Sequence, residues 1–524
     1  MNAIPGLPAA CRLVLIALAL LGLVPPAWAQ TPSAPEARSG WQGAVRATAR
    51  RTMVAAANPV AVEAGLGILR AGGNAIDAAV TVQLVLNLVE PQSSGIGGGS
   101  MALFWDADTG ALQTFDGRET APAAARTDRF LRDGQPMPFR EAVLSGKSIG
   151  VPGTLRLLET LHRRKGRLSW ADVLAPAIRL AEGGFPVSPR LHALLSLLPA
   201  DSFQPEARAY FYDRLGSARP EGFLLRNPAF AATLRQVAEG GADAFYSGDI
   251  AARIVAAAGA VPGAPGDLTA QDLASYRVIE RPPVCIPYRG LRVCGMGPPS
   301  SGGIAVAQVL GLIEPLAIGS KPASAMGPAA LHLVAEAEKL AYADRDYYIA
   351  DPDFVLPPTG LLDGGYLGER RALIDAGKVM PRPQPGTPKR VGGRALGADE
   401  TQEIAGTSHF SIVDEDRNVL AFTTTIEAGF GSRVWAAGFL LNNEMTDFSA
   451  RPVDRTGAAI ANAIAPGKRP RSSMAPTIVF DAAGKPWATL GSVGGQRIPL
   501  YVTKTLIALI DWKQKSTRLN SSHT

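Results

Sequence analysis

Two pairs of alternating segments in the last quarter of the chain constrain the fold most. Residues 408–413 and 419–426 alternate apolar and polar side chains around a polar turn, which predicts a β-hairpin. Residues 477–480 and 487–491 predict a second hairpin. Because a hairpin buries at least one face, another layer must cover it, and the earlier part of the chain offers mainly helices. The sequence therefore predicts a layered α+β domain.

Helical periodicity dominates the first half of the chain. One helix is expected to begin at Asn58-Pro59 and run to Leu69, before a pair of glycines. A second, over Asn74–Leu88, is apolar on almost every face and is therefore expected to be buried. Residues 155–198 and 228–258 continue the helical pattern, whereas residues 380–403 are expected to form a mobile connection.

The first 29 residues are typical of a secretory signal peptide. Arg12 precedes an apolar run, Leu13–Val24, and Ala27-Trp28-Ala29 offers small residues for cleavage. The run is too short for a membrane-spanning helix, which needs roughly 20 residues. We therefore expect no stable membrane anchor, with an uncleaved anchor as the alternative. Export predicts a periplasmic or secreted protein in an oxidising compartment.

The other end of the chain has an unusual composition. Residues 515–524, which include Lys515-Ser-Thr-Arg-Leu-Asn-Ser-Ser-His523, resemble the translation of a sequencing-adapter oligonucleotide. The alternative is a natural polar tail. We expect the protein proper to continue past Lys513, so that a helix over Leu500–Trp512 is followed by strands that are missing from this sequence.

Charge and residue counts exclude several classes of function. The 524 residues include 52 Lys and Arg against 46 Asp and Glu, and a net charge of +6 over this length does not favour a nucleic-acid partner. Three Cys and five scattered His do not favour a metal site.

If Arg289-Gly290 is a two-residue turn, Cys285 and Cys294 lie opposite each other, either as a disulfide or as two buried thiols.

A glycine-rich run, Gly95–Gly99, suggests a nucleotide-binding loop at first sight. The dinucleotide fingerprint needs a strand, a glycine turn and then a helix. Here the helix precedes the glycines, and a strand hairpin of residues 101–105 and 112–115 follows them. We therefore expect these glycines to allow close packing of the backbone near a site.

Gly406-Thr407 is the sharpest candidate for catalysis. A small residue before a hydroxyl residue at the start of a strand suits self-cleavage: the hydroxyl attacks the preceding carbonyl, and hydrolysis of the ester leaves a new N-terminal threonine. The free amine has a pKa nearer neutrality than that of lysine and can act as general base for its own hydroxyl. The alternative is an ordinary strand, in which threonine is common.

A series of motifs supports the catalytic interpretation. They are Asn74-Ala-Ile-Asp-Ala-Ala79, Phe115-Asp-Gly-Arg118-Glu119, Pro298-Pro-Ser-Ser-Gly-Gly303, Gly406-Thr-Ser-His409, Leu441-Asn-Asn-Glu-Met-Thr-Asp-Phe448, Arg469-Pro-Arg-Ser-Ser-Met474 and Gly491-Ser-Val-Gly-Gly-Gln-Arg-Ile498. Because these motifs occur in the order in which the family carries them, the chain resembles the gamma-glutamyltransferase (gamma-glutamyltranspeptidase) family from about Met53 to Lys513. The resemblance implies an N-terminal nucleophile hydrolase with a four-layer αββα sandwich. Residues 30–406 would form a large subunit and residues 407–513 a small catalytic subunit, which stay associated after cleavage between Gly406 and Thr407.

The same resemblance assigns the catalytic residues. Thr407 would be the nucleophile, and Thr425 would orient its amine. Gly494 and Gly495 would supply the N–H groups of an oxyanion hole, where two glycines leave the backbone unobstructed. His409 lies two residues from the nucleophile, but an N-terminal threonine needs no histidine base, so we expect it to have a structural or supporting role.

The substrate contacts also follow from the resemblance. A γ-glutamyl group carries an α-carboxylate and an α-ammonium on one carbon, so its site needs both a cation and acceptors. The implied residues are Arg118, Ser472 and Ser473 for the carboxylate, and Glu427, Glu444 and Asp447 for the ammonium. At the Glu427 position many relatives carry Asn. Outside a family context, Arg118 would be a turn charge, the serines a loop and Asp447 a helix cap.

The resemblance implies an exported γ-glutamyl hydrolase and transferase. Its substrates would be glutathione and other γ-glutamyl compounds, with water or an acceptor amino acid or peptide completing the reaction and no metal or organic cofactor. One alternative is an acylase of the same family that acts on glutaryl or cephalosporin side chains, which lack the ammonium. The other is an exported binding protein without catalysis.

Overall fold

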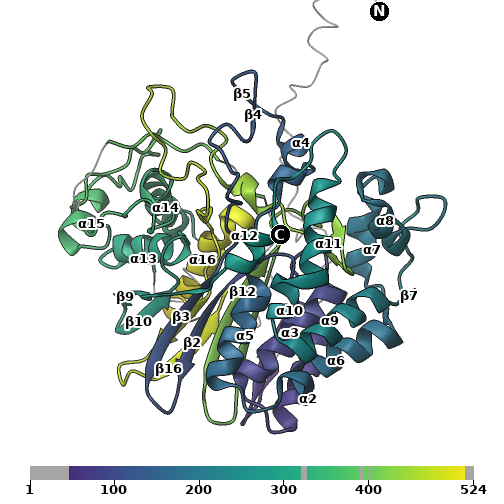
Figure 1. The fold of residues 1–524 in the computed structure, drawn as a ribbon. Coiled ribbons are helices and arrows are strands. Elements are labelled where there is room, and N and C mark those ends of the chain that lie inside the picture. The colour runs from purple at the N-terminus through teal and green to yellow at the C-terminus, as the bar shows by residue number, and fades with distance from the viewer. Residues whose placement is uncertain (1–46, 320–326, 390–394, 402, 405, 514–524) are drawn as a thin grey trace, which may run out of the picture.

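Two β-sheets lie face to face in the protein, between two layers of helices (Figure 1). The computed structural model describes residues 47–319, 327–389, 395–401, 403–404 and 406–513. The expected signal peptide at 1–29 and the tail at 515–524 therefore lie outside the described residues. The arrangement is the predicted four-layer αββα sandwich.

The larger sheet has six antiparallel strands. Their order is β1 (Met53–Ala55), β11 (Thr407–Val413), β12 (Val419–Thr425), β2 (Gly99–Asp106), β3 (Ala111–Gly117) and β8 (Ile279–Arg281). The hairpin predicted first is β11–β12, and its register places Thr407 opposite Thr425. On its other edge β12 pairs with β2, so that Thr425 also lies opposite Gly99. The glycine run and the candidate nucleophile therefore meet at one end of this sheet.

The smaller sheet has four antiparallel strands. Their order is β16 (Pro486–Leu490), β15 (Thr477–Phe480), β10 (Leu291–Gly295) and β9 (Val284–Tyr288). Arg289 and Gly290 join β9 to β10 with φ of 50° and 79°, as a two-residue hairpin turn requires. Cys285 lies opposite Cys294, with Cα atoms 4.1 Å apart, and the two form a disulfide. Of the two alternatives for this pair, the disulfide is confirmed.

Helices cover the outer face of each sheet. The first predicted helix is α2 (Pro59–Arg70), and the second is α3 (Ala75–Val89), which is capped by Asn74 and buried at every position. The other helices on this side are α5 (Thr154–Lys165), α6 (Trp170–Gly183), α7 (Pro189–Ser196), α8 (Pro205–Phe211), α9 (Pro228–Gly240), α10 (Asp243–Tyr246), α11 (Gly248–Gly259) and α12 (Ala270–Ser275). On the smaller sheet lie α13 (Gly302–Ile313), α14 (Pro328–Tyr348), α15 (Gly364–Arg371) and α16 (Ile498–Ile510).

Apolar side chains alternate between the two faces of the larger sheet, so that one face packs against the helices and the other against the smaller sheet. On β2, Ala102 and Phe104 pack against the helices, whereas Met101 and Leu103 point between the sheets. On β12, Leu420 and Phe422 again face the helices, and Ala421 faces the other sheet. Because side chains alternate along a strand, Thr423 and Thr425 share the face of Ala421. Threonines of the candidate site therefore lie between the sheets.

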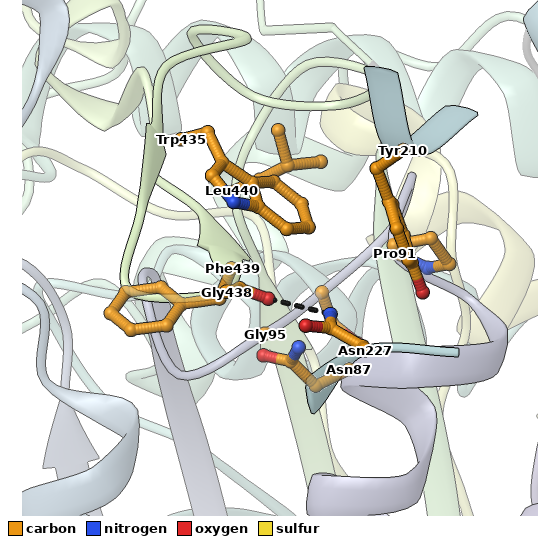
Figure 2. A pocket seen from close by; sticks show the side chains of 10 residues that line it. Asn87, Pro91, Gly95, Tyr210, Asn227, Trp435, Gly438, Phe439 and Leu440 are labelled. Carbon is orange, nitrogen blue, oxygen red and sulfur yellow. Dashed lines mark hydrogen bonds between the residues drawn. The ribbon is translucent and has the colours of Figure 1, made fainter. Parts of the chain in front are cut away.

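The glycine-rich loop packs tightly against a small hairpin of β13 (Trp435–Ala436) and β14 (Phe439–Leu440). Figure 2 shows the pocket beside this contact, where Asn227, the N-terminal cap of α9, donates a hydrogen bond to the carbonyl of Gly438 at 2.8 Å. A Cβ at Gly97 would overlap the carbonyl of Leu440. The cavity between loop and hairpin measures about 10 Å³, far too little for a nucleotide. The predicted role of the glycines in close backbone packing is confirmed.

The connection that was expected to be mobile is only partly described, because residues 390–394, 402 and 405 lie outside the described residues. Its described parts are bonded to the fold. The N–H of Met380 donates to Glu336 at 2.8 Å, and the carbonyl of Gly386 accepts from the Tyr348 hydroxyl at 2.7 Å. Asp399 is buried and accepts from Asn462 at 3.2 Å.

Candidate active site

Thr407 begins β11 with its side chain on the inner face of the sheet. It is 4% exposed, and its antiparallel partner Thr425 is 3% exposed. Directly paired residues project to the same face, so both hydroxyl groups lie between the two sheets. The fold thus removes the candidate nucleophile from bulk water.

The backbone around Gly406 leaves no room for a side chain. A Cβ at this position would overlap the carbonyl oxygen of Glu427 and the backbone of Ala428. The carbonyl oxygen of Gly406 accepts a hydrogen bond from the Thr425 hydroxyl at 2.9 Å. That hydroxyl in turn accepts from the N–H of Glu427 at 2.8 Å, which directs its proton toward the carbonyl.

This arrangement suits attack on the Gly406 carbonyl. When the Thr407 hydroxyl adds to that carbon, negative charge develops on the oxygen that Thr425 already contacts, and a preplaced donor lowers the barrier to such a step. The sequence assigned Thr425 to the free amine of Thr407. In the continuous chain that amine is still part of a peptide bond, and Thr425 instead contacts the carbonyl of Gly406.

Gly494 and Gly495 follow β16 in a turn that leads into α16. Their φ values of 132° and 54° lie in the region that favours glycine. A side-chain contact joins Ser411 to Thr489 at 3.2 Å, and a Cβ at Gly491 would overlap the ring of His409. The chain of β16 therefore advances along β11 toward Thr407, and the two glycines come next in that direction.

His409 is part of a hydroxyl network rather than a base for Thr407. Its ring nitrogens contact the hydroxyls of Thr423 at 2.9 Å and Ser411 at 3.0 Å. Burial lowers the pKa of His409 to about 3, so the ring is neutral near pH 7. These contacts agree with the supporting role that was expected for it.

Arg118 lies at the centre of a buried ionic cluster. It is 1% exposed and follows the end of β3. One terminal nitrogen donates to Glu444 Oε1, and the other donates to Asp447 Oδ2 at 2.5 Å and to the carbonyl of Arg471 at 2.7 Å. The one-turn 3₁₀ helix Glu444–Asp447 presents both carboxylates to it. The residues expected to bind opposite ends of a substrate are thus paired with each other in the uncleaved chain.

Carboxylates outnumber cations around Arg118. Glu119 also lies 3.8 Å from its guanidinium, and burial raises the pKa of Glu119 to about 7. Burial likewise raises the pKa values of Glu444 and Asp447 well above their usual range, although Arg118 counteracts this. Glu444 Oε2 and Asp447 Oδ1 are buried and find no hydrogen-bond donor among the residues that the structure describes. The cluster therefore lacks positive charge and has acceptors to spare.

Glu427 lies beside this cluster in a constrained conformation. Its φ is 73°, in the left-handed region, and its carboxylate accepts from the N–H of Ile404 at 3.0 Å and from Asn443 at 2.5 Å. Burial, together with the nearby charge of Asp447, raises the pKa of Glu427 well above its usual range. Glu427 therefore joins the segment before Thr407 to the ionic cluster.

The hydroxyls of the two serines bond to groups other than the Arg118 guanidinium. Ser472 Oγ accepts from the N–H of Met474 at 3.1 Å. Ser473 Oγ donates to Glu403 and accepts from Arg345 at 2.6 Å. Glu403, four residues before Thr407, thus occupies the hydroxyl that was expected to contact the substrate carboxylate.

Several residues of the site have no counterpart in the sequence-based assignment. Arg345, on α14, forms an ion pair with Glu403. Arg471 is fully buried and pairs with Asp399 at 3.0 Å. Arg471 stands inside the Arg469–Met474 motif, which was a usable signal, but nothing near Arg345 in the sequence marks it as a partner of Glu403.

Membrane spans and metal sites were sought in the described part of the chain. Among those residues no helix is long and apolar enough to cross a bilayer. Nor do three or more His, Cys, Asp or Glu side chains there gather in a way that could hold a metal ion.

Comparisons with known proteins identify the family of the chain. Residues 61–521 match the family described as Gamma-glutamyltranspeptidase. The "Glutathione hydrolase proenzyme" of Bacillus subtilis (strain 168) is 37% identical over 469 residues, which cover 88% of this chain and 78% of that protein. The "Acylase ACY 1 proenzyme" of Pseudomonas sp. (strain V22) is 36% identical and covers 89% of this chain and 80% of its own length.

A solved structure shows the same fold. The cephalosporin acylase from Bacillus halodurans superposes with a TM-score of 0.77 at 30% identity, over 90% of this chain and 83% of that chain. The family match spans most of the sequence, and the relatives exceed 30% identity over most of both chains. The chain belongs to the gamma-glutamyltranspeptidase family.

Proposed function

We propose that this chain is an autoprocessing γ-glutamyl hydrolase and transferase that cleaves the γ-glutamyl amide of glutathione and related compounds. The observation that carries the proposal is the buried cluster at Arg118. It combines one guanidinium with carboxylate oxygens of Glu444 and Asp447 that have no donor among the described residues. A ligand that brings both a carboxylate and an ammonium satisfies the two halves of such a site at once.

Maturation would occur between Gly406 and Thr407. The Thr407 hydroxyl attacks the Gly406 carbonyl carbon, the C–N bond breaks, and the nitrogen becomes a free amine while the acyl group moves to the hydroxyl oxygen. Water then hydrolyses this ester and leaves a carboxylate on Gly406. The products would be a large subunit of residues 30–406 and a small subunit that begins at Thr407, of which this sequence holds residues 407–513, and the two would remain associated. The contact of Thr425 with the Gly406 carbonyl supports this step.

In the processed enzyme, Thr407 Oγ would attack the γ-carbonyl of the substrate while its own amine accepts the proton. Thr425 would orient that amine, and the N–H groups of Gly494 and Gly495 would stabilise the oxyanion. The leaving amine departs with a proton, and a γ-glutamyl ester remains on Thr407. Water, or the amine of an acceptor amino acid or peptide, then releases the γ-glutamyl group.

Binding would exchange internal pairs for substrate pairs. The substrate carboxylate would contact Arg118, with the hydroxyls of Ser472 and Ser473 nearby, and Glu403 would first release Ser473. The ammonium would donate hydrogen bonds to the carboxylates of Glu427, Glu444 and Asp447. Its positive charge would bring the net charge of the cluster closer to zero. Because burial raises the pKa of these carboxyl groups, a bound cation would restore their ionised form.

Two measurements test the proposal. The purified protein should separate on a denaturing gel into two fragments, and the smaller should begin Thr-Ser-His-Phe; Thr407→Ala should remain one band. The mature enzyme should hydrolyse γ-glutamyl anilide, and Arg118→Ala should be processed but bind this substrate poorly. A single unprocessed wild-type band would support a binding protein without catalysis.

The similarity to an acylase proenzyme and to a cephalosporin acylase favours one second candidate, an acylase for glutaryl-type side chains. Such substrates lack the ammonium and would leave Glu444 Oε2 and Asp447 Oδ1 without a partner. Turnover of γ-glutamyl anilide should therefore exceed that of glutaryl anilide. A preference for glutaryl anilide would refute the glutamyl assignment while leaving the autoprocessing mechanism intact.

We also propose export to the periplasm or the medium. The signal-like residues 1–29 and the disulfide between Cys285 and Cys294 support it, because disulfides persist in oxidising compartments. Fractionation of the producing cells tests it: activity in the cytosolic fraction alone would contradict export.

A further inference from the structure

An open cleft of about 920 Å³ lies outside the site described above. It is bordered by the short 3₁₀ helix Ala200–Ser202, by α8 and by residues 432–434, which lead into β13. In Figure 1, α8 lies at the edge of the helical layer on the right. None of the residues proposed for catalysis or γ-glutamyl binding lines this cleft. It is therefore a separate cavity.

Arginines dominate the charge of the cleft. Arg208 is paired with Asp201 at 2.7 Å. The lining holds three other arginines, which are Arg214, Arg219 and Arg433. None of the three forms an ion pair with a carboxylate of the described residues. The remaining acid, Asp213, uses Oδ1 to accept from two backbone N–H groups of its own turn. The cleft thus carries a surplus of positive charge.

Arg433 is the most unusual of these cations. Its φ of 61° places the backbone in the left-handed region. The N–H of Gln204 donates to the carbonyl of Arg433, and the side-chain oxygen of Gln204 accepts from the N–H of Trp435, so that Gln204 holds residues 433–435 in place. Its guanidinium lies 5.3 Å from the ring centroid of Phe203 and donates to the hydroxyl of Ser202. Its Nε is buried and has no acceptor among the described residues.

The electrostatic environment of the Arg433 guanidinium is unfavourable. Burial lowers the pKa of Arg433 to about 10, and the charge of Arg140 adds to this effect. Arg433 is partly buried, and a cation that loses part of its hydration without a counter-ion is destabilised, so such groups normally pair with an anion. A second donor nearby is similar, because Nε of Arg219 is also buried without an acceptor in the part of the chain that the structure describes.

The walls of the cleft between these cations are apolar. They are formed by Leu144, Phe203, Pro205, Tyr212, Val261 and Val434. Small-molecule sites combine such walls with a few placed polar groups, which fix the orientation of the ligand. The ligand that matches this cleft carries an anionic head for the arginines and an apolar body for the walls.

We propose that this cleft is a second binding site, which takes a carboxylate with an apolar or aromatic body, its carboxylate held by Arg433 and Arg219. A planar guanidinium donates charge-assisted hydrogen bonds to a carboxylate, and two of its nitrogens can donate at once. Arg214, at the exposed rim, adds attraction for the anion. The site is independent of the γ-glutamyl assignment, since none of its residues belongs to that machinery.

The test measures binding of N-acetyl-L-phenylalanine to the full-length protein by calorimetry, with N-acetyl-L-phenylalaninamide as the neutral comparison. The acid should bind about ten-fold more tightly than the amide, or better, because the amide cannot form the charge-assisted bonds. Arg433→Met should weaken binding of the acid by about the same factor. Arg382→Gln removes an exposed cation from a different cleft and should leave binding unchanged.

Each remaining outcome bears on the proposal. Arg214→Gln alters an exposed side chain and should weaken binding of the acid even if Arg433→Met does not fold. Arg433→Met should retain γ-glutamyl anilide turnover, because the cleft is separate from the catalytic residues. The proposal is overturned if acid and amide bind equally, if neither arginine variant affects the acid, or if inorganic phosphate competes as effectively as the acid, since phosphate has no apolar body.

Discussion

The hydroxyl of Thr425 offers the sharpest test of how the chain cleaves itself. It donates to the Gly406 carbonyl at 2.9 Å and accepts from the N–H of Glu427 at 2.8 Å. Thr425→Val keeps the shape of the side chain but removes this donor from the carbonyl where negative charge develops. We expect processing of the precursor to slow severely while the fold is retained.

The magnitude follows from two effects. Loss of one preplaced donor to an oxyanion slows comparable reactions by about 10²–10³-fold, or about 3–4 kcal/mol in the barrier. The N–H of Glu427 also loses its acceptor in a buried position, which lowers the free energy of unfolding by about 1–3 kcal/mol. Thr425→Ser restores a hydroxyl and should recover most of the rate.

The assay is a time course of precursor cleavage on a denaturing gel, with thermal unfolding measured on the same samples. Thr423→Val is the matched control, because Thr423 lies on the same strand and face and its hydroxyl bonds to His409 at 2.9 Å instead of to Gly406. The control should lose stability to a similar extent and still be processed at the normal rate. Equal rates for Thr425→Val and the wild type, or equal slowing in both variants, would refute the reasoning.

Three further predictions follow from the geometry. Gly406→Val should abolish processing, since its Cβ would overlap the Glu427 carbonyl, whereas Gly429→Ala should be tolerated because nothing lies within 4 Å; a gel of both precursors tests this. Burial lowers the pKa of His409 to about 3, below its unfolded value near 6.5, so the unfolded chain binds the extra proton and stability falls as the pH drops from about 6.5 toward 3. Melting curves of His409→Gln should show a shallower decline over that window, and an unchanged slope would contradict the burial. Removal of the Cys285–Cys294 disulfide, with a sequence separation of 9, should lower the free energy of unfolding by about 2–3 kcal/mol in denaturant titrations; no change after substitution of both by Ser would argue against the bond.

The sequence by itself determined the layers and the candidate cleavage site. Alternation with a period of two fixed the faces of β11 and β12, and the all-apolar pattern of α3 marked it as buried. Gly406-Thr407 at the start of a strand marked the candidate bond for cleavage, and the spacing around Arg289-Gly290 placed the two cysteines opposite each other. These features depend on local geometry, which a few neighbouring residues specify.

Only the tertiary structure decided which charged groups meet. Arg118 pairs with carboxylates more than 300 positions away, Ser473 is occupied by Glu403 rather than by Arg118, and the partly buried Arg433 has no carboxylate partner among the described residues. A sequence pattern fixes the face on which a side chain lies. The distance to a partner on another element depends on sheet register, on loop paths and on the packing of whole layers, so it emerges only when the chain is folded.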